Sequence, residues 1–362
     1  MLRLRPPLFR HAAAATAALT LACTGTTAPA PGPAPAPVAQ SVSWLCATAP
    51  LEIPLQKAGV PAGSRAIDVA LSADKVSILL SPARIVTFSR TDPRDVDMLV
   101  GGEKSPWRAI DRDPTDGSLW VASDESVSLL HITEAGERKI ISGPAVQGQG
   151  GLRQIRVTKD AIYATPTSAQ SAVWRMSRTG GKLLGQAFPQ PNAEEIPDAR
   201  DALRWNFWLA RDLDGSVTAF DLGTGELHRA GDDGAWSPLP SPFPAHPRSS
   251  GRSLHGAQVG TFSESWYFTD EIRGFFFTPG GPTLLGAGTV GVHTRGTVLF
   301  RMKDGQIENA MEPCTRNPLT AVVSDAVGFA AISGDELVET STSGVRSVSS
   351  SRVLVGRYTP AN

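Results

Sequence analysis

A short pattern of strand, polar turn and strand recurs along this chain, and it constrains the fold more than any other feature. The clearest copy is residues 110–122, Ile-Asp-Arg-Asp-Pro-Thr-Asp-Gly-Ser-Leu-Trp-Val-Ala. The second apolar segment of each copy is centred on one of these residues: Leu79, Trp120, Tyr163, Trp208, Tyr267 and Ala330. The first three steps between the centres are 41, 43 and 45 residues, and the last two are 59 and 63. A repeated unit of strands cannot bury both of its faces alone, so neighbouring copies must pack against one another.

The length of the early steps predicts the architecture. Four-stranded propeller blades repeat every ~40–50 residues, and short apolar runs bounded by turn residues follow several centres, as in residues 126–136 and 217–225. We find no long stretch with helical periodicity after residue 45. The sequence therefore predicts an all-β fold, a six-bladed β-propeller over residues 42–362, with a seventh blade left open by the strand-and-turn stretch 297–305. The last strand candidate, residues 353–358, is expected to complete the first blade and so close the ring.

A resemblance to a known family supports this interpretation. Residues 110–124 resemble an NHL-type blade, which runs apolar-Asp-x-Asp-Gly-x-Leu-Tyr-Val-Ala-Asp, with a small insertion in the turn. Residues 266–270, Trp-Tyr-Phe-Thr-Asp, resemble its second half. The chain is thus similar, over about residues 60–345, to the six-bladed propellers of the NHL, gluconolactonase-like and streptogramin-lyase-like group. It lacks the Asn-Asn-Arg-Ile element that follows in NHL blades, so the resemblance implies the fold rather than a subfamily.

The N-terminus predicts export. Arg3, Arg5 and Arg10 precede an apolar run over residues 12–22, which is typical of a secretory signal peptide, assigned to residues 1–22. The segment ends in Leu-Thr-Leu-Ala-Cys, which resembles a bacterial lipobox and marks Cys23 for lipidation. Residues 23–41 then form a Pro/Ala-rich linker. We expect a membrane-anchored lipoprotein of the cell envelope; ordinary cleavage near residue 22, giving a periplasmic or secreted protein, is the alternative.

Two further cysteines lie near the two ends of the repeat region, Cys46 and Cys314. An even number of cysteines in an exported protein suggests a disulfide, and a closed ring brings its first and last blades together. The sequence therefore predicts a Cys46–Cys314 bond that latches the ring. The alternative is two separate buried thiols, because free cysteine is often a small core residue.

Arginines enter several of the predicted first strands, and they are the main candidates for ligand binding. They are Arg65, Arg108, Arg153, Arg252 and Arg316. In a propeller the first strand of each blade lines the central channel, so equivalent arginines form a ring at one mouth. Guanidinium groups donate forked hydrogen bonds to carboxylate or phosphate groups. The alternative is that the arginines tie adjacent blades through carboxylates such as Asp68 and Asp111.

Acidic residues follow the predicted second strands and are expected at the same mouth, among them Asp124 and Asp270. In lactonase-like relatives such loops hold one divalent cation, which needs several converging oxygen ligands. This chain has no matching asparagines there, so we assign no metal ligand and no cofactor, with a divalent cation as the alternative. Streptogramin-lyase-like enzymes use a histidine base, but neither His255 nor any other histidine lies in a recognisable constellation, and we assign no catalytic residue.

Together these patterns predict an exported, lipid-anchored binding or interaction module with its ligand or partner at the channel mouth. The partner is expected to be an anionic small molecule or an envelope protein. The formal net charge of −1 gives no electrostatic basis for nucleic-acid binding, and the membrane is contacted through the lipid anchor only. We expect a monomer. A metal-dependent lactonase-like hydrolase or streptogramin-lyase-like enzyme, and a structural envelope component, remain the alternative functions.

Overall fold

The strands of the computed structural model form antiparallel four-stranded sheets. The structure describes residues 45–47, 49–55, 60, 64–81, 84–92, 94, 96–100, 106–144, 150–167, 171–189, 207–221, 225–241, 243, 272–290, 294–303, 306–311, 319–334, 337–341, 344–348 and 351–358. The chain divides into two units between Gln40 and Ser41, and all described residues belong to the second.

Within the described residues there are six four-stranded sheets, each a blade. Blade 1 contains β2 (Arg65–Leu71), β3 (Lys75–Ser81), β4 (Arg84–Ser89) and β5 (Val96–Val100). Blade 2 contains β6 (Trp107–Arg112), β7 (Leu119–Ser123), β8 (Ser128–Ile132) and β9 (Arg138–Ser142). Blade 3 contains β10 (Leu152–Val157), β11 (Ile162–Pro166), β12 (Ser171–Met176) and β13 (Leu183–Pro189). Blade 4 contains β14 (Phe207–Arg211), β15 (Val217–Asp221), β16 (Leu227–Ala230) and β17 (Trp236–Leu239).

The last two blades are less regular. Blade 5 contains β18 (Ile272–Thr278), β19 (Gly281–Val290), β20 (Thr294–Lys303) and β21 (Gln306–Met311). Blade 6 contains β22 (Leu319–Ser324), β23 (Gly328–Gly334), β26 (Ser351–Arg357) and β1 (Leu51–Pro54). A two-stranded sheet, β24 (Leu337–Ser341) and β25 (Gly344–Val348), is inserted between β23 and β26.

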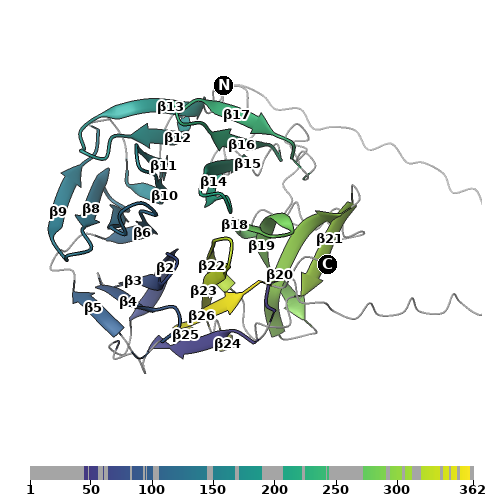
Figure 1. Cartoon of the computed structure of the whole chain (residues 1–362). Coiled ribbons are helices and arrows are strands. Elements are labelled where there is room, and N and C mark those ends of the chain that lie inside the picture. The colour runs from purple at the N-terminus through teal and green to yellow at the C-terminus, as the bar shows by residue number, and fades with distance from the viewer. Residues whose placement is uncertain are drawn as a thin grey trace, which may run out of the picture. The chain divides into compact units, whose positions relative to one another are not determined.

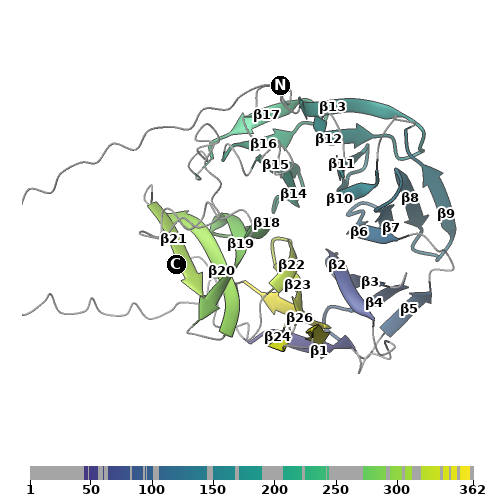
Figure 2. The same ribbon diagram turned by 180° about the vertical axis from the view of Figure 1, so that it is seen from behind.

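The first strands of the blades form the inside of a closed ring. Contacts run from β2 to β6, β10, β14, β18 and β22 in turn, and from β22 back to β2. The blades follow one another in this order in Figure 1 and, seen from behind, in Figure 2. The predicted all-β propeller is therefore confirmed.

Apolar side chains fill the junctions between the blades. Six buried clusters are found among the described residues, and each joins two neighbouring blades around the ring. Trp120 and Trp174 fill the junction of blades 2 and 3, and Phe220 packs against Phe275 between blades 4 and 5. Period-2 alternation leaves each strand with two faces, and because both faces meet a neighbouring blade, strands such as β7 and β15 are buried along their whole length.

The ring closes differently from the sequence prediction. Residues 353–358 were expected to complete the first blade, but β26 is the third strand of blade 6, paired with β23. The N-terminal strand β1 then pairs antiparallel with β26 and supplies the fourth strand. Ile53 lies opposite Val353 in this register, and both are buried in the cluster that joins blades 6 and 1.

The stretch that left a seventh blade open, residues 297–305, belongs to blade 5 in its described part. Residues 297–303 belong to β20, the third strand of blade 5, where Thr297 pairs with Ala287 of β19. The hairpin of β19 and β20 is long, ten residues in each strand. The step of 63 residues starts at Tyr267, which lies outside the described residues and precedes β19, the second strand of blade 5. Among the described residues there is no helix long and apolar enough to cross a bilayer.

Candidate functional site

A cavity of about 450 Å³ lies at the end of the ring where the inner strands finish. Its wall contains the last residues of β2, β6, β10, β14 and β22, the turns that follow four of these strands, and part of β18. We call it the strand-end cavity. It is lined by Leu71, Ser72, Ala73, Asp74, Lys75, Asp111, Arg112, Asp113, Pro114, Gly117, Glu134, Arg156, Ala210, Arg211, Asp212, Leu213, Asp214, Gly215, Phe275, Phe276, Val322, Val323, Ser324 and Asp325.

The turn between β6 and β7 shows how the local sequence shapes this wall. The Asp113 carboxylate accepts the backbone N–H of Thr115 at 2.7 Å, and the backbone N–H of Asp113 donates to the Ser118 carbonyl at 2.9 Å. Gly117 has a φ of 71°, a left-handed conformation that glycine adopts without a steric penalty. The Gly117 carbonyl accepts a hydrogen bond from Arg112 Nη1 at 2.6 Å, so the turn holds this guanidinium beneath the cavity.

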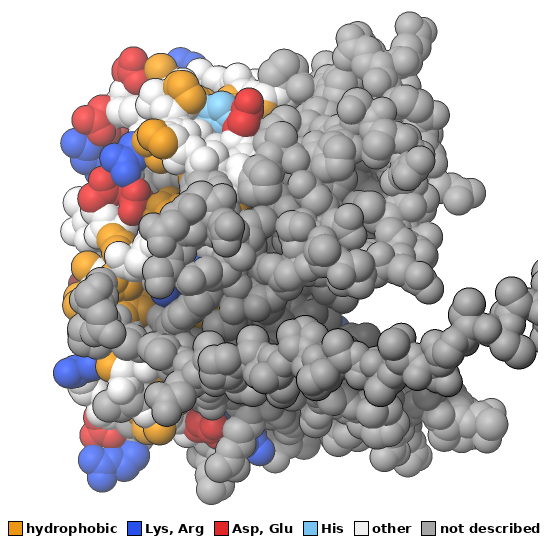
Figure 3. Space-filling view, turned by 90° about the vertical axis from the view of Figure 1, so that its right-hand side faces the viewer, with side chains coloured by type: hydrophobic (Ala, Val, Ile, Leu, Met, Phe, Trp, Pro, Cys, Tyr) orange, Lys and Arg blue, Asp and Glu red, His pale blue; other side chains and the backbone are white. Residues whose placement is uncertain are grey.

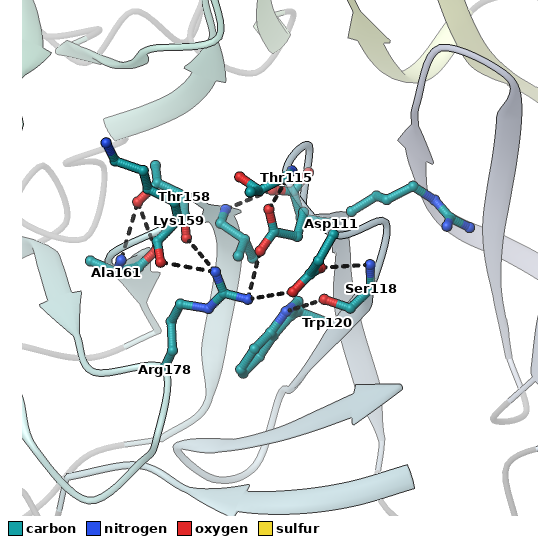
Figure 4. A network of polar contacts seen from close by, with 12 residues as sticks. Asp111, Thr115, Ser118, Trp120, Thr158, Lys159, Ala161 and Arg178 are labelled. Atoms are coloured by element: carbon teal, nitrogen blue, oxygen red, sulfur yellow. Dashed lines mark hydrogen bonds and ion pairs between the residues drawn. The ribbon is translucent and has the colours of Figure 1, made fainter. Parts of the chain in front are cut away.

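Ion pairs join the turns of neighbouring blades around the rim. Arg178, in the turn after β12 of blade 3, lies 2.6 Å from Asp113 Oδ2 and 3.0 Å from Asp116 Oδ2 of blade 2. The same guanidinium donates to the carbonyls of Thr158 and Lys159, and it lies 5.5 Å from the ring centroid of Trp120. Figure 4 shows Arg178 reaching across this junction. Because Asp113 is fully buried, this ion pair neutralises a carboxylate that water cannot reach.

Equivalent pairs are found at two other junctions. Arg90 of blade 1 donates to both carboxylate oxygens of Asp325 in blade 6, at 2.5 and 3.2 Å. Lys75 of blade 1 lies 3.5 Å from Glu134 of blade 2. In ring order, in which blade 1 follows blade 6, the earlier blade supplies the cation in this pair, whereas in the other two it supplies the acid. Figure 3 shows acidic and basic side chains interspersed along the described edge of the molecule. The rim acids of these junctions are thus already paired with cations.

In blade 4 the acidic residues of the turn between β14 and β15 pair with an arginine of the same blade. Arg229 Nη2 lies 2.5 Å from Asp212 Oδ2, and Arg229 Nη1 lies 3.2 Å from Asp214 Oδ2. The hydrogen bonds of Asp214 with Ser216 are the largest cause that lowers the pKa of the Asp214 carboxyl, and the charge of Arg229 adds to this effect. Both carboxylates therefore belong to the turn and are paired with Arg229.

Three guanidinium groups face the cavity from blades 2, 3 and 4. Arg112 is 5% exposed and donates to Ser77 Oγ at 2.7 Å, and burial lowers its pKa. Arg156 is half-buried and donates to the Ile155 carbonyl at 2.7 Å. In the part of the chain that the structure describes, no carboxylate lies within ion-pair distance of either Arg112 or Arg156.

The third guanidinium, Arg211, is fixed by a buried carboxylate. Arg211 Nη2 donates to Asp111 Oδ2 at 2.6 Å, and the same oxygen accepts the backbone N–H of Val157 at 2.7 Å. Asp111 on β6 therefore ties β10 and β14 to the same point. Arg211 Nη1 is buried and has no hydrogen-bond partner among the described residues. A fixed guanidinium with an unused donor is a preorganised group for an incoming acceptor.

Asp68 makes a comparable tie one blade earlier. Its Oδ2 accepts the backbone N–H of Ile110 on β6 at 3.0 Å, and its Oδ1 accepts the N–H of Val69. Burial raises the pKa of Asp68 to about 6, and the charge of Arg156 opposes this effect. Gln154 repeats the arrangement by accepting the N–H of Leu209 on β14. The inner strands are thus joined by side-chain acceptors as well as by apolar packing.

The arginines predicted as a ring are not equivalent in the structure. The β-sheet register shifts between Trp107 and Ala109 and between Leu152 and Gln154, so Arg108 and Arg153 occupy matching β-bulges on β6 and β10. On β2 the shift lies between Ala66 and Asp68, so Ile67 is the matching residue and Arg65 lies two positions earlier.

Arg108 and Arg153 are brought together, at the end opposite the strand-end cavity. Burial lowers the pKa of Arg153, and the neighbouring charge of Arg108 lowers it further. Asp124 lies beside them, since its backbone N–H donates to the Pro106 carbonyl and its carbonyl accepts the N–H of Gly151. Their predicted contact with an anionic group stays a prediction. Other predicted site residues lie outside the described residues: Cys23, Arg252, Asp270, Cys314 and Arg316.

Arg112, Arg156 and Arg211 were not predicted as site residues from the sequence. A usable signal was present, because Arg112-Asp113 and Arg211-Asp212 are matching pairs at the end of β6 and of β14. In the described part of the chain no group of three His, Cys, Asp or Glu side chains is arranged to hold a metal ion. The histidine considered for catalysis, His255, lies outside that part.

Comparison with known proteins gives similarity of fold only at a low level. No protein-family model matches the chain, and no curated protein sequence matches it. Among solved structures, the chain is similar to virginiamycin B lyase from Staphylococcus aureus, with 13% identity, a TM-score of 0.45, and coverage of 78% of this chain and 80% of the lyase. It is also similar to a gluconolactonase from Xanthomonas campestris, with 14% identity, a TM-score of 0.44, and coverage of 88% and 98%. A propeller domain of Cps50 (Swd1) from Myceliophteria thermophila has 10% identity, a TM-score of 0.45, and coverage of 80% and 81%. Proteins of unrelated activity share this level of similarity, which therefore identifies no substrate.

Proposed function

We propose that this protein is an exported binding module that holds a small anionic ligand in the strand-end cavity. The observation that carries the proposal is an imbalance among the lining charges. Asp113, Asp212, Asp214 and Asp325 are each paired with an arginine that lies outside the lining. Four of the seven acids of the wall are thus neutralised by groups that do not face the ligand. Of the other three, Glu134 pairs with Lys75 and Asp111 with Arg211, and no ion pair of Asp74 is found among the described residues.

The cations of the wall are less fully neutralised. Arg112 and Arg156 have no carboxylate within ion-pair distance in the described structure, and Arg211 shares Asp111 with a backbone N–H. An anionic group placed between Arg156 and Arg211 would accept charge-assisted hydrogen bonds, which are stronger than neutral ones. The volume of about 450 Å³ is in the range of small-molecule sites in proteins.

The binding proposal is tested by titrating the purified protein calorimetrically with citrate, acetate and inorganic phosphate. We expect at least one anion to bind, and Arg156→Gln and Arg211→Gln each to weaken it by about 10-fold or more, because a hydrogen bond to a charged group contributes about 1.5–3 kcal/mol. Arg352→Gln is the matched control, since Arg352 pairs with Glu52 outside the cavity. Binding that survives both cavity substitutions unchanged would overturn the proposal.

Export and anchoring are part of the same proposal and rest on the N-terminal sequence. The signal-like residues 1–22, Cys23 and the Pro/Ala-rich linker support a lipid-anchored envelope protein. Radiolabelled fatty acid should be incorporated into the wild-type protein expressed in a bacterial host and not into Cys23→Ser. Labelling of both proteins, or of neither, would refute lipidation at this residue.

A further inference from the structure

The walls of the strand-end cavity differ in chemistry from one side of the ring to the other. Arg112, Arg156 and Arg211 come from blades 2, 3 and 4. On the remaining side, β18 of blade 5 contributes Phe275 and Phe276, and β22 of blade 6 contributes Val322 and Val323. Blade 1 adds Ser72, Asp74 and Lys75, and the turns of blades 2 and 4 also contribute carboxylates. The cavity therefore has a charged half, which contains the three guanidinium groups, and an apolar half formed by blades 5 and 6.

The apolar half still exposes surface to solvent. Val323 of blade 6 is only partly buried, although it packs against the core of its junction. Leu213, in the turn after β14 of blade 4, is also partly buried and packs against the junction with blade 5. The acid on this side, Asp325, is held by Arg90 and by the backbone N–H groups of Val327 and Gly328. A ligand lying against blades 5 and 6 would therefore meet apolar side chains and no uncommitted charge among the described residues.

This asymmetry extends the proposed function, on which it rests, to a class of ligand. We propose that the strand-end cavity binds an amphipathic monocarboxylate, with its carboxylate at Arg156 and Arg211 and its apolar body against Val322, Val323 and Phe276. A ligand that is charged along its whole length would leave the apolar half wet and bury its charges against valine and phenylalanine, which is unfavourable. A neutral apolar ligand would leave the guanidinium groups without an acceptor.

The carboxylate series acetate, butanoate and hexanoate tests this inference, with hexan-1-ol and hexylammonium as probes of equal length and different charge. Each methylene buried against the apolar half should tighten binding about fourfold, so hexanoate, with four more methylenes, is expected to bind about 250-fold more tightly than acetate. Hexan-1-ol and hexylammonium should bind at least about 10-fold more weakly than hexanoate. Arg156→Gln should remove the preference for the carboxylate and leave part of the chain-length dependence.

A paired substitution separates the apolar half from the rest of the site. Val323→Thr keeps the shape of the side chain and adds a hydroxyl, so it should reduce the gain from acetate to hexanoate without weakening acetate. Val327→Thr is the control, because Val327 is 60% exposed and lies outside the lining. Equal thermal unfolding midpoints of the two variants will show that both remain folded.

The outcomes distinguish the two proposals. Acetate or phosphate binding with no gain from chain length would overturn this inference and leave the proposed anion site standing. Hexan-1-ol binding as tightly as hexanoate would overturn both, because the guanidinium groups would then contribute nothing. Failure of every probe to bind would also overturn both.

Discussion

Substitution of Asp111 gives the sharpest test of how the ring holds its binding groups. Asp111 is 6% exposed, and its Oδ2 accepts both the backbone N–H of Val157 and Nη2 of Arg211. Asp111→Asn keeps the size of the side chain and an acceptor for Val157, but it removes the charge opposite Arg211. A hydrogen bond between charged groups contributes about 1.5–3 kcal/mol, and breaking a buried pair costs about 3–5 kcal/mol. We expect Asp111→Asn to lower the free energy of unfolding by about 3 kcal/mol.

A double-mutant cycle in urea separates the pair from the other contacts of each residue. If the two side chains act as a pair, Asp111→Asn and Arg211→Gln together should cost at least about 1 kcal/mol less than the sum of the single substitutions. Asp116→Asn combined with Arg211→Gln is the control, and these two substitutions should be additive. Asp116 is about half exposed, and its ion pair is with Arg178, which it shares with Asp113. Additivity of Asp111→Asn and Arg211→Gln within about 0.5 kcal/mol would refute the view that Asp111 fixes Arg211.

Three further predictions concern the rim, the channel and the closure of the ring. Because burial raises the pKa of Asp68 from 3.8 to about 6, the folded state binds this proton more tightly than the unfolded state does. The resulting stability is fully present below pH 3.8 and is lost as the pH rises through 6, by about 3 kcal/mol in all. Urea unfolding of the wild type should show a loss of about 2 kcal/mol between pH 4 and pH 6.5 from this group, and Asp68→Asn should not show it. Arg178→Ala should lower the free energy of unfolding by about 3 kcal/mol, because it leaves the buried carboxylate of Asp113 unpaired. Lys75→Ala, at the exposed pair with Glu134, should cost under about 1 kcal/mol in the same assay. Equal costs of the two substitutions would contradict the burial argument. A non-reduced digest should contain Cys46 linked to Cys314, and Cys46→Ser should lower stability by about 4 kcal/mol; alkylation of both cysteines without reductant would exclude the bond.

The repeat spacing was sufficient to predict the propeller, because strand, turn and strand recur with the length of a blade. It was not sufficient to predict how the ring closes. Residues 51–54 and 351–357 are both short apolar strands, and either could pair at the junction of blades 6 and 1. Which of them becomes the outer strand depends on three-dimensional contacts with β23, and no local pattern records these contacts.

The site was harder to predict because residues at the start and residues at the end of the inner strands recur at the same interval along the sequence. Arg108 and Arg153 repeat at the strand starts, while Arg112 and Arg211 repeat at the strand ends. Sequence spacing is the same at both ends and cannot tell which one encloses a cavity. On β2 the bulge residue that matches Arg108 and Arg153 is Ile67, and Arg65 lies two positions earlier, a difference that approximate repeat spacing does not detect.

The most direct test of the account is the position of a bound carboxylate in crystals of the protein grown with 6-bromohexanoate. Anomalous scattering from bromine locates the apolar end of this probe without ambiguity. We predict a bromine peak against Val323 and Phe276, with the carboxylate within hydrogen-bond distance of Arg156 and Arg211. A bromine peak beside Arg108 and Arg153, at the opposite end of the inner strands, would contradict the account, as would an empty strand-end cavity at a saturating probe concentration.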